Sequence, residues 1–101
     1  MTTRIDLNET QATITLDGRL DTPSAHAVET EVKKVMIPEI QSVVVECTSL
    51  SYISSSGLRI LITLYKYVTK VGGQLTLKAV SPAIREIFDM TGFTSIFTIV
   101  D

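Results

Sequence analysis

Tyr52-Ile53-Ser54-Ser55-Ser56-Gly57-Leu58-Arg59 leads three consecutive serines and a glycine into a long amphipathic segment. Small hydroxyl residues in this place predict a helix N-terminus, because serine is a favoured cap for backbone N–H groups that lack partners within the helix. One hydroxyl suffices for a cap, so the others remain spare at the same corner, where Gly57 has no side chain to crowd them. The helix dipole also favours negative charge there. The corner suits simple capping, or a functional hydroxyl that carries a phosphate.

The segment after Gly57 predicts a helix that is covered on most sides. Two apolar rows with helical spacing share it: Leu58, Leu61, Ile62 and Tyr65, and then Ile60, Leu64, Tyr67 and Val71. Together they span roughly 220° at ~100° per residue, whereas an ordinary surface helix has an apolar stripe of about 100°. Such a helix either lies between a sheet and neighbouring helices or offers one apolar flank to a partner. Gly72-Gly73 predicts its end through a left-handed cap.

The composition limits the classes of protein that are compatible with the chain. Its 101 residues are 45% hydrophobic and 20% charged, which is typical of one globular domain over residues 1–101. The formal charge is −2 and basic residues do not cluster, so direct nucleic-acid binding is not expected. The single Cys47 forms no internal disulfide, and no apolar stretch approaches a membrane span. We expect a cytoplasmic protein without membrane insertion.

The remaining patterns predict one α/β domain with the order ββαβαβαβ. The elements expected around the serine helix are a hairpin within 5–16, a helix from about residue 22 that stops before Pro38, a strand at 42–47, a strand at 74–79, a helix after Ser81-Pro82 that ends at Gly92, and a strand at 96–100. The β-branched strand 42–47 should be central and buried on both faces. The serines follow that strand, and open α/β sheets bind ligands beyond the carboxyl ends of their strands.

Intrinsic catalysis is not expected. A serine hydrolase needs a base and an orienting acid, and the only arrangement open to this chain is Ser56, His26 and Asp21. No Gly-x-Ser-x-Gly elbow surrounds the serine, and His26 falls on the polar side of its helix, as a solvated surface histidine would. The glycines and lysine of a phosphate-binding loop are also missing, and one histidine makes no ordinary metal site. We therefore expect no enzyme, no cofactor and no metal.

Three motifs that occur together in order carry a family resemblance: Gly18-Arg19-Leu20-Asp21, Ser55-Ser56-Gly57-Leu58, and Ser81-Pro82 followed by Phe88-Asp89-Met90-Thr91-Gly92-Phe93. Over nearly its whole length the chain resembles a stand-alone STAS domain of the anti-sigma factor antagonist family, which has a mixed sheet with helices packed on it. The resemblance implies a bacterial regulator. In that family an anti-sigma factor with serine kinase activity, which itself binds ATP or ADP, binds the unmodified antagonist and releases sigma factor. Phosphorylation of the antagonist then ends the interaction, and a serine phosphatase is a further partner that the resemblance suggests.

Carried over by position, the phosphoacceptor is Ser56, with Ser55 as the fallback. Asp21 matches the acidic residue of the family's first strand-to-helix loop, whereas Ser54 stands where the family often has aspartate. The expected partner surface comprises the first loop, the serine corner and a half-exposed start of the helix: Asp21, Thr22, Ser24, Ser54, Ser55, Gly57, Leu58 and Arg59. Two alternatives remain, namely a member that binds without being phosphorylated and a constitutive STAS subunit of a transporter or stress-signalling assembly.

Overall fold

The computed structural model describes residues 1–101 as one mixed sheet with three α-helices. In chain order the elements are β1 (Thr2–Asn8), β2 (Gln11–Leu20), α1 (Thr22–Lys33), β3 (Ser42–Glu46), β4 (Leu50–Ile53), α2 (Ser55–Lys70), β5 (Gln74–Lys78), α3 (Pro82–Thr91), the short 3-10 helix η1 (Phe93–Ser95) and β6 (Thr98–Val100). The predicted α/β class and the predicted elements are confirmed, and β4 and η1 are additions to them.

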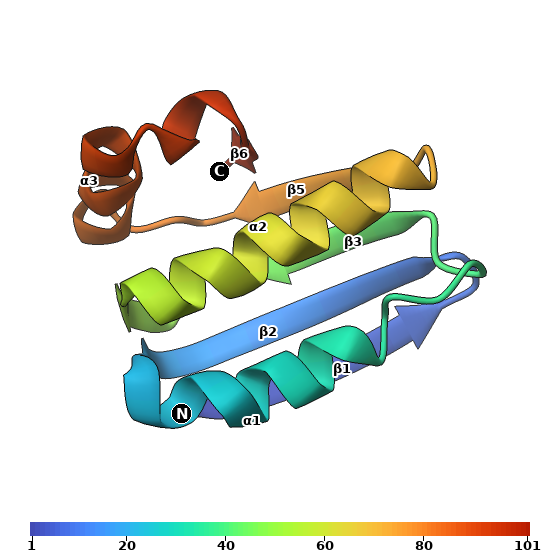
Figure 1. The fold of residues 1–101 in the computed structure, drawn as a ribbon, viewed down its shortest axis with the longest axis horizontal. Coiled ribbons are helices and arrows are strands. Elements are labelled where there is room, and N and C mark those ends of the chain that lie inside the picture. Colours follow the sequence, from blue (N-terminus) through green and yellow to red (C-terminus); the bar gives the residue numbers. More distant parts are fainter.

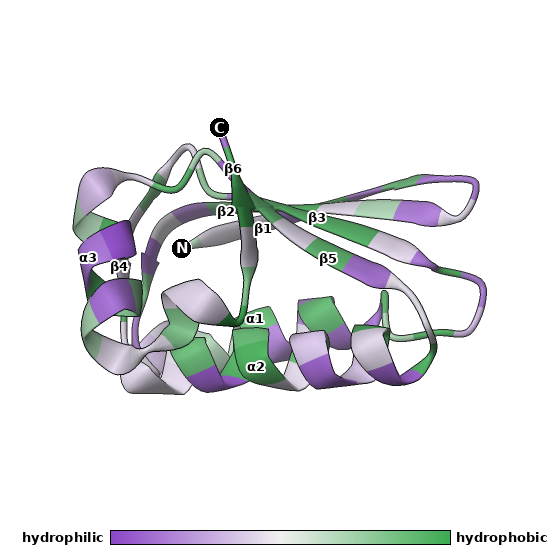
Figure 2. Cartoon of the chain, turned by 90° about the horizontal axis from the view of Figure 1, so that it is seen from above, coloured by the Kyte–Doolittle hydropathy of each residue, from purple (hydrophilic) through white to green (hydrophobic).

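The main sheet has the strand order β1-β2-β3-β5-β6, with β3 in the middle as predicted. Only the β1–β2 hairpin is antiparallel, and the other neighbouring strands run parallel. Helices α1 and α2 both lie on one face of this sheet, while α3 lies at one end of the molecule near β4 (Figures 1 and 2). The molecule therefore has two layers, and the second face of the sheet is not covered by a helix.

This one-sided packing corrects the expectation for the central strand. Val43 and Val45 of β3 are each 1% exposed and belong to the hydrophobic core, but Val44 between them is only half-buried. The neighbouring strands place Thr13 and Thr76 opposite Val44, and both are also half-buried. The continuous apolar sequence of β3 had suggested burial on both faces, whereas helices cover just one.

Strand β4 extends the end of β2 towards the serines. The first half of β2 pairs with β3, and its last residues pair in parallel with β4, so that Leu20 lies opposite Ile53. The register shifts between Gly18 and Arg19, where Gly18 has a φ of +112° that only glycine adopts easily. The serine run thus begins directly beyond two neighbouring parallel strands.

Helix α2 packs against α1, β4 and β5, as the first of the two alternatives for its wide apolar arc predicts (Figure 1), while Leu58 and Ile62 line a hollow between α2 and the α3 region. Gly72 supplies the expected left-handed conformation with a φ of +79°. The apolar spacing predicts that Val71 is covered, but Val71 is 45% exposed, because the helix ends at Lys70 and Val71 is its C-cap. Val68 takes the buried place in the last turn.

The C-terminal segment is anchored by aromatic packing. Phe88 of α3 is fully buried, and its ring centroid lies 5.5 Å from that of Phe97. Tyr65 of α2 and Phe93 of η1 each approach Phe97 at 6.1 Å. Because Phe97 closes the turn after η1, the last strand begins at Thr98, two residues later than predicted.

Two truncations within α3 test this packing. Phe88→Ala should lower the free energy of unfolding by about 3 to 5 kcal/mol, because its removal loses the free energy gained by burying the aromatic ring and leaves a cavity in the core. Met90→Ala removes a side chain that is 80% exposed and should change stability by no more than about 0.5 kcal/mol. Urea denaturation monitored by circular dichroism measures both, and equal losses would contradict the described core.

Candidate functional site

Ser54 is the N-cap of α2. It has an extended backbone (φ −91°, ψ 174°), and its side-chain oxygen accepts a hydrogen bond from the Gly57 N–H at 3.2 Å. Its carbonyl accepts the first helical bond, from the Leu58 N–H at 2.9 Å. Aspartate and serine are comparable N-caps. Serine at this position therefore preserves the helix start that aspartate would also support, and one of the three hydroxyls has a structural task.

Gly57 allows the first turn of α2 to touch the ends of two strands. A β-carbon at this position would lie 2.6 Å from Leu20 Cγ and 2.8 Å from Ile53 Cγ1, which is closer than real β-carbons come to other heavy atoms. Beside this contact, the Ser54 N–H donates to the Leu20 carbonyl at 2.8 Å. Space, and not an unusual backbone angle, thus requires glycine here.

The first strand-to-helix loop, directly after Leu20, is held by a capping box. The Asp21 carboxylate accepts hydrogen bonds from the backbone N–H and the hydroxyl of Ser24, at 3.1 and 2.9 Å, and the Asp21 N–H donates back to Ser24 Oγ at 3.0 Å. These bonds, the one from the Ser24 side chain foremost, hold the pKa of Asp21 below its ordinary value of 3.8, and the nearby Arg19 guanidinium adds to the effect. Arg19 also lies over the Tyr52 ring, 4.4 Å from its centroid, and so connects the loop to β4.

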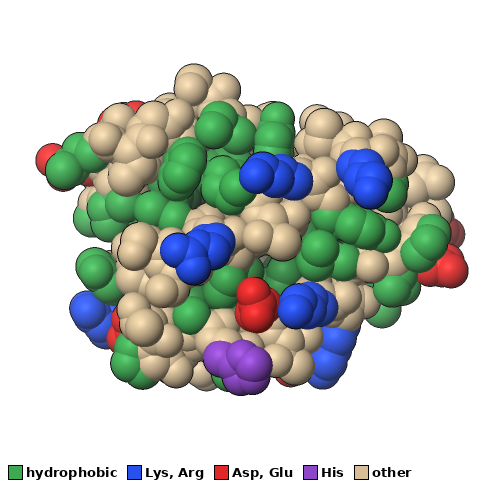
Figure 3. Space-filling model, in the orientation of Figure 1, with side chains coloured by type: hydrophobic (Ala, Val, Ile, Leu, Met, Phe, Trp, Pro, Cys, Tyr) green, Lys and Arg blue, Asp and Glu red, His purple; other side chains and the backbone are tan.

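The two helix starts enclose a hollow of about 260 Å³ between α1 and α2. Its lining includes three residues of the predicted site, namely Thr22, Ser56 and Arg59. The other four come from the two helices: Ala25, His26, Glu29 and Ile60. Figure 3 shows this helical face, with the histidine and several basic groups on it. The structure therefore brings Thr22, the half-buried Ser56 and the exposed Arg59 together.

Ser55 lies on the other side of α2. It lines a second hollow, of about 350 Å³, that runs towards α3 and η1 and is formed by Ser55, Leu58, Arg59, Ile62, Thr91 and Phe93. The expectation that Leu58 is half exposed is wrong, because this side chain is only 6% exposed and belongs to the core. Helix α2 thus divides the predicted surface into two hollows, and Arg59 lines both.

The conceivable catalytic arrangement is not assembled. His26 lines the hollow beside Ser56, but no hydrogen bond joins its ring to Ser56 or to Asp21, and the Asp21 carboxylate is occupied by Ser24. A serine nucleophile needs a hydrogen-bonded base that is oriented by a third group. The geometry therefore does not favour hydrolysis.

Sequence reasoning considered His26 only as the base of a hydrolase-like arrangement and included neither His26 nor Glu29 in the partner surface. Their only signal is their spacing after Thr22, at i+4 and i+7, which places all three on one face of α1. That spacing does not reveal which helix the face meets. Thr91 and Phe93 join the second hollow in the same way, through packing between elements that are distant in the sequence.

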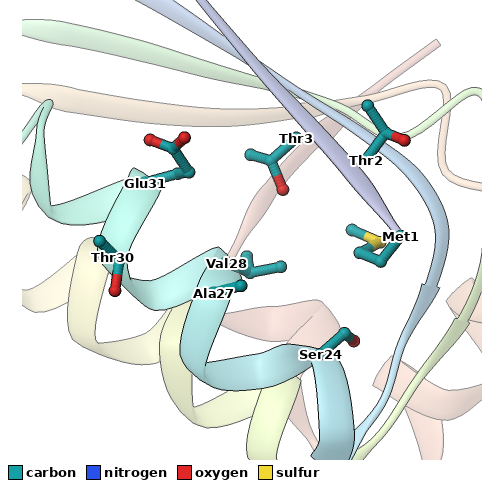
Figure 4. A pocket seen from close by; sticks show the side chains of 8 residues that line it. All are labelled: Met1, Thr2, Thr3, Ser24, Ala27, Val28, Thr30 and Glu31. Atoms are coloured by element: carbon teal, nitrogen blue, oxygen red, sulfur yellow. The ribbon is translucent and has the colours of Figure 1, made fainter.

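The largest hollow is elsewhere, between β1 and α1, with a volume of about 500 Å³ (Figure 4). It shares only Ser24 with the predicted site, and that hydroxyl is already used in the capping box. The lining offers threonine hydroxyls and a single carboxylate, from Glu31, and no nucleophile–base pair. None of the helices combines the length and the hydropathy that crossing a bilayer would require.

Comparison with known proteins identifies the class. The profile of the STAS domain matches residues 4–101, so the chain belongs to the STAS domain family. It is 34% identical over 86 residues to BtrV of Bordetella bronchiseptica, provisionally named an anti-sigma factor antagonist, with 85% of this chain and 74% of BtrV covered. It is 31% identical over 93 residues to the anti-sigma-B factor antagonist of Bacillus subtilis, with 91% and 84% covered. The relatives are thus bacterial proteins named for one role.

Solved structures show the same fold. TM1081 of Thermotoga maritima superimposes with a TM-score of 0.89 at 15% identity, over 98% of this chain and 86% of that one. SpoIIAA in its unphosphorylated form gives 0.78 at 18% identity, over 99% and 88%. The phosphorylated form of SpoIIAA from Bacillus gives 0.77 at 18% identity, over 99% and 92%. At these identities the likeness concerns the fold.

Substitutions of neighbouring serines test the cap. Ser54→Ala should lower the free energy of unfolding by about 1 kcal/mol, because the Gly57 N–H loses its partner, whereas Ser54→Asp should leave stability close to that of the wild type. Ser55→Ala is the matched control, since this exposed hydroxyl makes no hydrogen bond and its loss should change stability by no more than about 0.5 kcal/mol. Thermal melts would contradict the assignment if Ser55→Ala proved the more damaging change.

The lowered pKa of Asp21 predicts how its contribution to stability depends on pH. The ionised carboxylate favours the folded state, so its contribution is full above the ordinary value of 3.8 and disappears as the pH falls through the lower pKa of the folded protein. The difference in unfolding free energy between wild type and Asp21→Asn should therefore shrink as the pH is lowered from about 6 towards 3. Urea titrations across this range measure the difference in unfolding free energy, and a difference that grows at lower pH would contradict the predicted direction.

Proposed function

We propose that the chain is an anti-sigma factor antagonist that is controlled by phosphorylation of Ser56. The unmodified form binds an anti-sigma factor with serine kinase activity and thereby frees the sigma factor, and the phosphorylated form does not bind. The names of the relatives support the general role. The observation that carries the proposal for Ser56 is its position, at the corner where the first turns of α1 and α2 meet.

The three serines differ in hydrogen bonding and in the hollow that they face, and the two differences together favour Ser56 as the acceptor. Ser54 is occupied as the helix cap, whereas the side chains of Ser55 and Ser56 make no hydrogen bond. Ser56 lines the hollow that the first loop also lines, through Thr22. Ser55 faces α3 instead. A partner that covers the corner would therefore reach Ser56 and the Asp21 loop together.

The chemistry belongs to the partner. The Ser56 Oγ attacks the γ-phosphorus of ATP held by the kinase, so that a new O–P bond forms while the bond to the β,γ-bridging oxygen breaks and ADP leaves. The hydroxyl proton passes to a base of the kinase, since no side chain of this chain is hydrogen-bonded to Ser56. A serine phosphatase would restore the hydroxyl by hydrolysis. In this proposal the domain, residues 1–101, acts in the cytoplasm as a substrate and ligand without catalytic activity of its own.

The magnitudes indicate that the switch acts at the interface. A phosphate adds about 1.5 to 2 negative charges, and at a helix N-terminus the dipole stabilises such charge by about 0.3 to 1 kcal/mol. Like charges forced together across an interface are unfavourable by several kcal/mol, which is a hundredfold or more in affinity. The fold should thus tolerate the phosphate while the complex does not.

The proposed partner surface follows the predicted residues with one change of role. Asp21, Thr22 and Ser24 contribute the first loop, Ser54 to Gly57 the corner, and Arg59 the exposed start of α2. Leu58 lies at the base of the second hollow and does not project from the surface. The proposed partner surface therefore combines the two hollows and the Arg59 side chain, which lines both of them.

The identity of the acceptor is tested by intact-mass measurement after incubation with the kinase partner and ATP. We expect one phosphate on the wild type and on Ser55→Ala, and none on Ser56→Ala. Both variants lose one hydroxyl from the same turn, so each controls for the other. Full phosphorylation of Ser56→Ala would move the acceptor to another residue.

A further inference from the structure

The hollow beside Ser56 contains donor groups from two helices that have no partner within the protein. Thr22 and His26 enter from α1, and Ser56 and Arg59 from α2. The ion pairs of the protein involve Arg4, Arg19, Lys33 and Lys34, so the Arg59 guanidinium is free of them. The side chains of Thr22, His26 and Arg59 also make no hydrogen bond.

We infer that this hollow is an intramolecular receiving site for the phosphate on Ser56, with Arg59 as its principal ligand and Thr22 and His26 as further donors. The inference deepens the proposed function and rests on it for the choice of Ser56 as the modified residue. It assigns a structural place to the phosphate within the unbound domain, in addition to its repulsion of the partner.

The geometry places these groups within mutual reach. Ser56 and Arg59 are separated by three residues on α2, and Thr22 and His26 by four on α1, so each pair is adjacent on its own helix surface. The planar guanidinium of Arg59 matches the oxygens of a phosphate with two parallel hydrogen bonds. The Thr22 hydroxyl and a ring N–H of His26 would donate from the opposite wall. The hollow, at about 260 Å³, has room for the group.

The two acidic groups near the hollow each lie beside a basic side chain. Glu29 is the only carboxylate in the lining, and its Oε1 lies 3.9 Å from Lys33 Nζ on the same helix. Asp21 follows the end of β2, but its carboxylate accepts from Ser24 and lies 3.8 Å from Arg19. The unpaired charge that faces Ser56 from α2 is therefore the positive charge of Arg59.

The site gives phosphorylation a second effect on the proposed surface. Arg59 lines both hollows and belongs to the predicted contact residues. When it binds the phosphate, it is drawn towards α1 and withdrawn from a partner. One covalent event then adds negative charge and removes a positive group from the same surface.

The test uses phosphoserine incorporated genetically at position 56, so no kinase is needed. The second ionisation of the phosphate, with a pKa near 6, is followed by ³¹P NMR. Arg59→Gln should raise this pKa by about half a unit relative to wild type, which is about a threefold change in proton affinity. Lys66→Gln removes a positive charge about two turns further along α2, outside the hollow, and should leave the value unchanged. The helix dipole acts equally in both variants.

Phosphoserine at position 55 supplies a positional control. Arg59 lines the hollows of both serines, but His26 lines only that of Ser56. His26→Ala should therefore shift the phosphate pKa at position 56 and not at position 55. Equal phosphate pKa values in Arg59→Gln and Lys66→Gln would overturn the inference. So would an equal shift of the phosphate pKa at positions 55 and 56 in response to His26→Ala. Either result would leave the proposed function untouched, and failure of a kinase to modify Ser56 would not affect this test.

Discussion

The contact of Gly57 with Leu20 and Ile53 is the constraint on which the rest of the corner depends. No side chain fits between the first turn of α2 and the ends of β2 and β4, since a β-carbon would come within 2.6 Å of Leu20 Cγ. The hydrogen bond from the Ser54 N–H to the Leu20 carbonyl fixes the same approach. Asp21, the next residue after Leu20, is the N-cap of α1. The two helix starts are therefore held together by the backbone and by buried apolar atoms, and not by the polar groups that the function would use.

This arrangement separates the contacts that hold the fold from the hydroxyl that the proposed switch would use. Ser56 makes no hydrogen bond that the fold needs, and the core beneath it contains only hydrophobic side chains. A charge added at its Oγ thus changes a surface without removing a structural contact. The proposed switch requires only that the partner distinguish a hydroxyl from a phosphate.

The sequence predicts those features that depend on local rules. Capping serines, prolines in first helical turns and left-handed glycines placed one helix start within the serine run 54–56, another at Ser81, and helix ends at Gly72 and Gly92. Alternation placed most strands. Strand β4 was missed because it has only four residues without strict alternation of buried and exposed positions, and because its partner is the far end of β2 beyond a register shift. The pairing of β4 with β2 depends on tertiary structure, and no local sequence pattern predicts it.

In the candidate site, too, local motifs predict some features, and packing between distant elements determines the others. The family motif places Ser56 and Asp21, and the structure shows both at one corner. The neighbours from α1 and the separation of Ser55 from Ser56 follow from how helices pack, which the apolar spacing did not specify. Burial of Leu58 was likewise misjudged: the side chain is 6% exposed and belongs to the core, at the edge of a hollow that Thr91 and Phe93 also line, and the helical period does not reveal these neighbours.

The central claim is that phosphate on Ser56 prevents binding without disturbing the domain. The most direct measurement is calorimetric titration of the ADP-loaded kinase partner with unmodified protein and with protein that carries genetically encoded phosphoserine at position 56, alongside amide NMR spectra of both free forms. The account predicts an affinity about a hundredfold or more lower for the phosphorylated form. Spectral changes should be confined to the first turns of α1 and α2. Equal affinities, or changes that extend across the sheet, would contradict it.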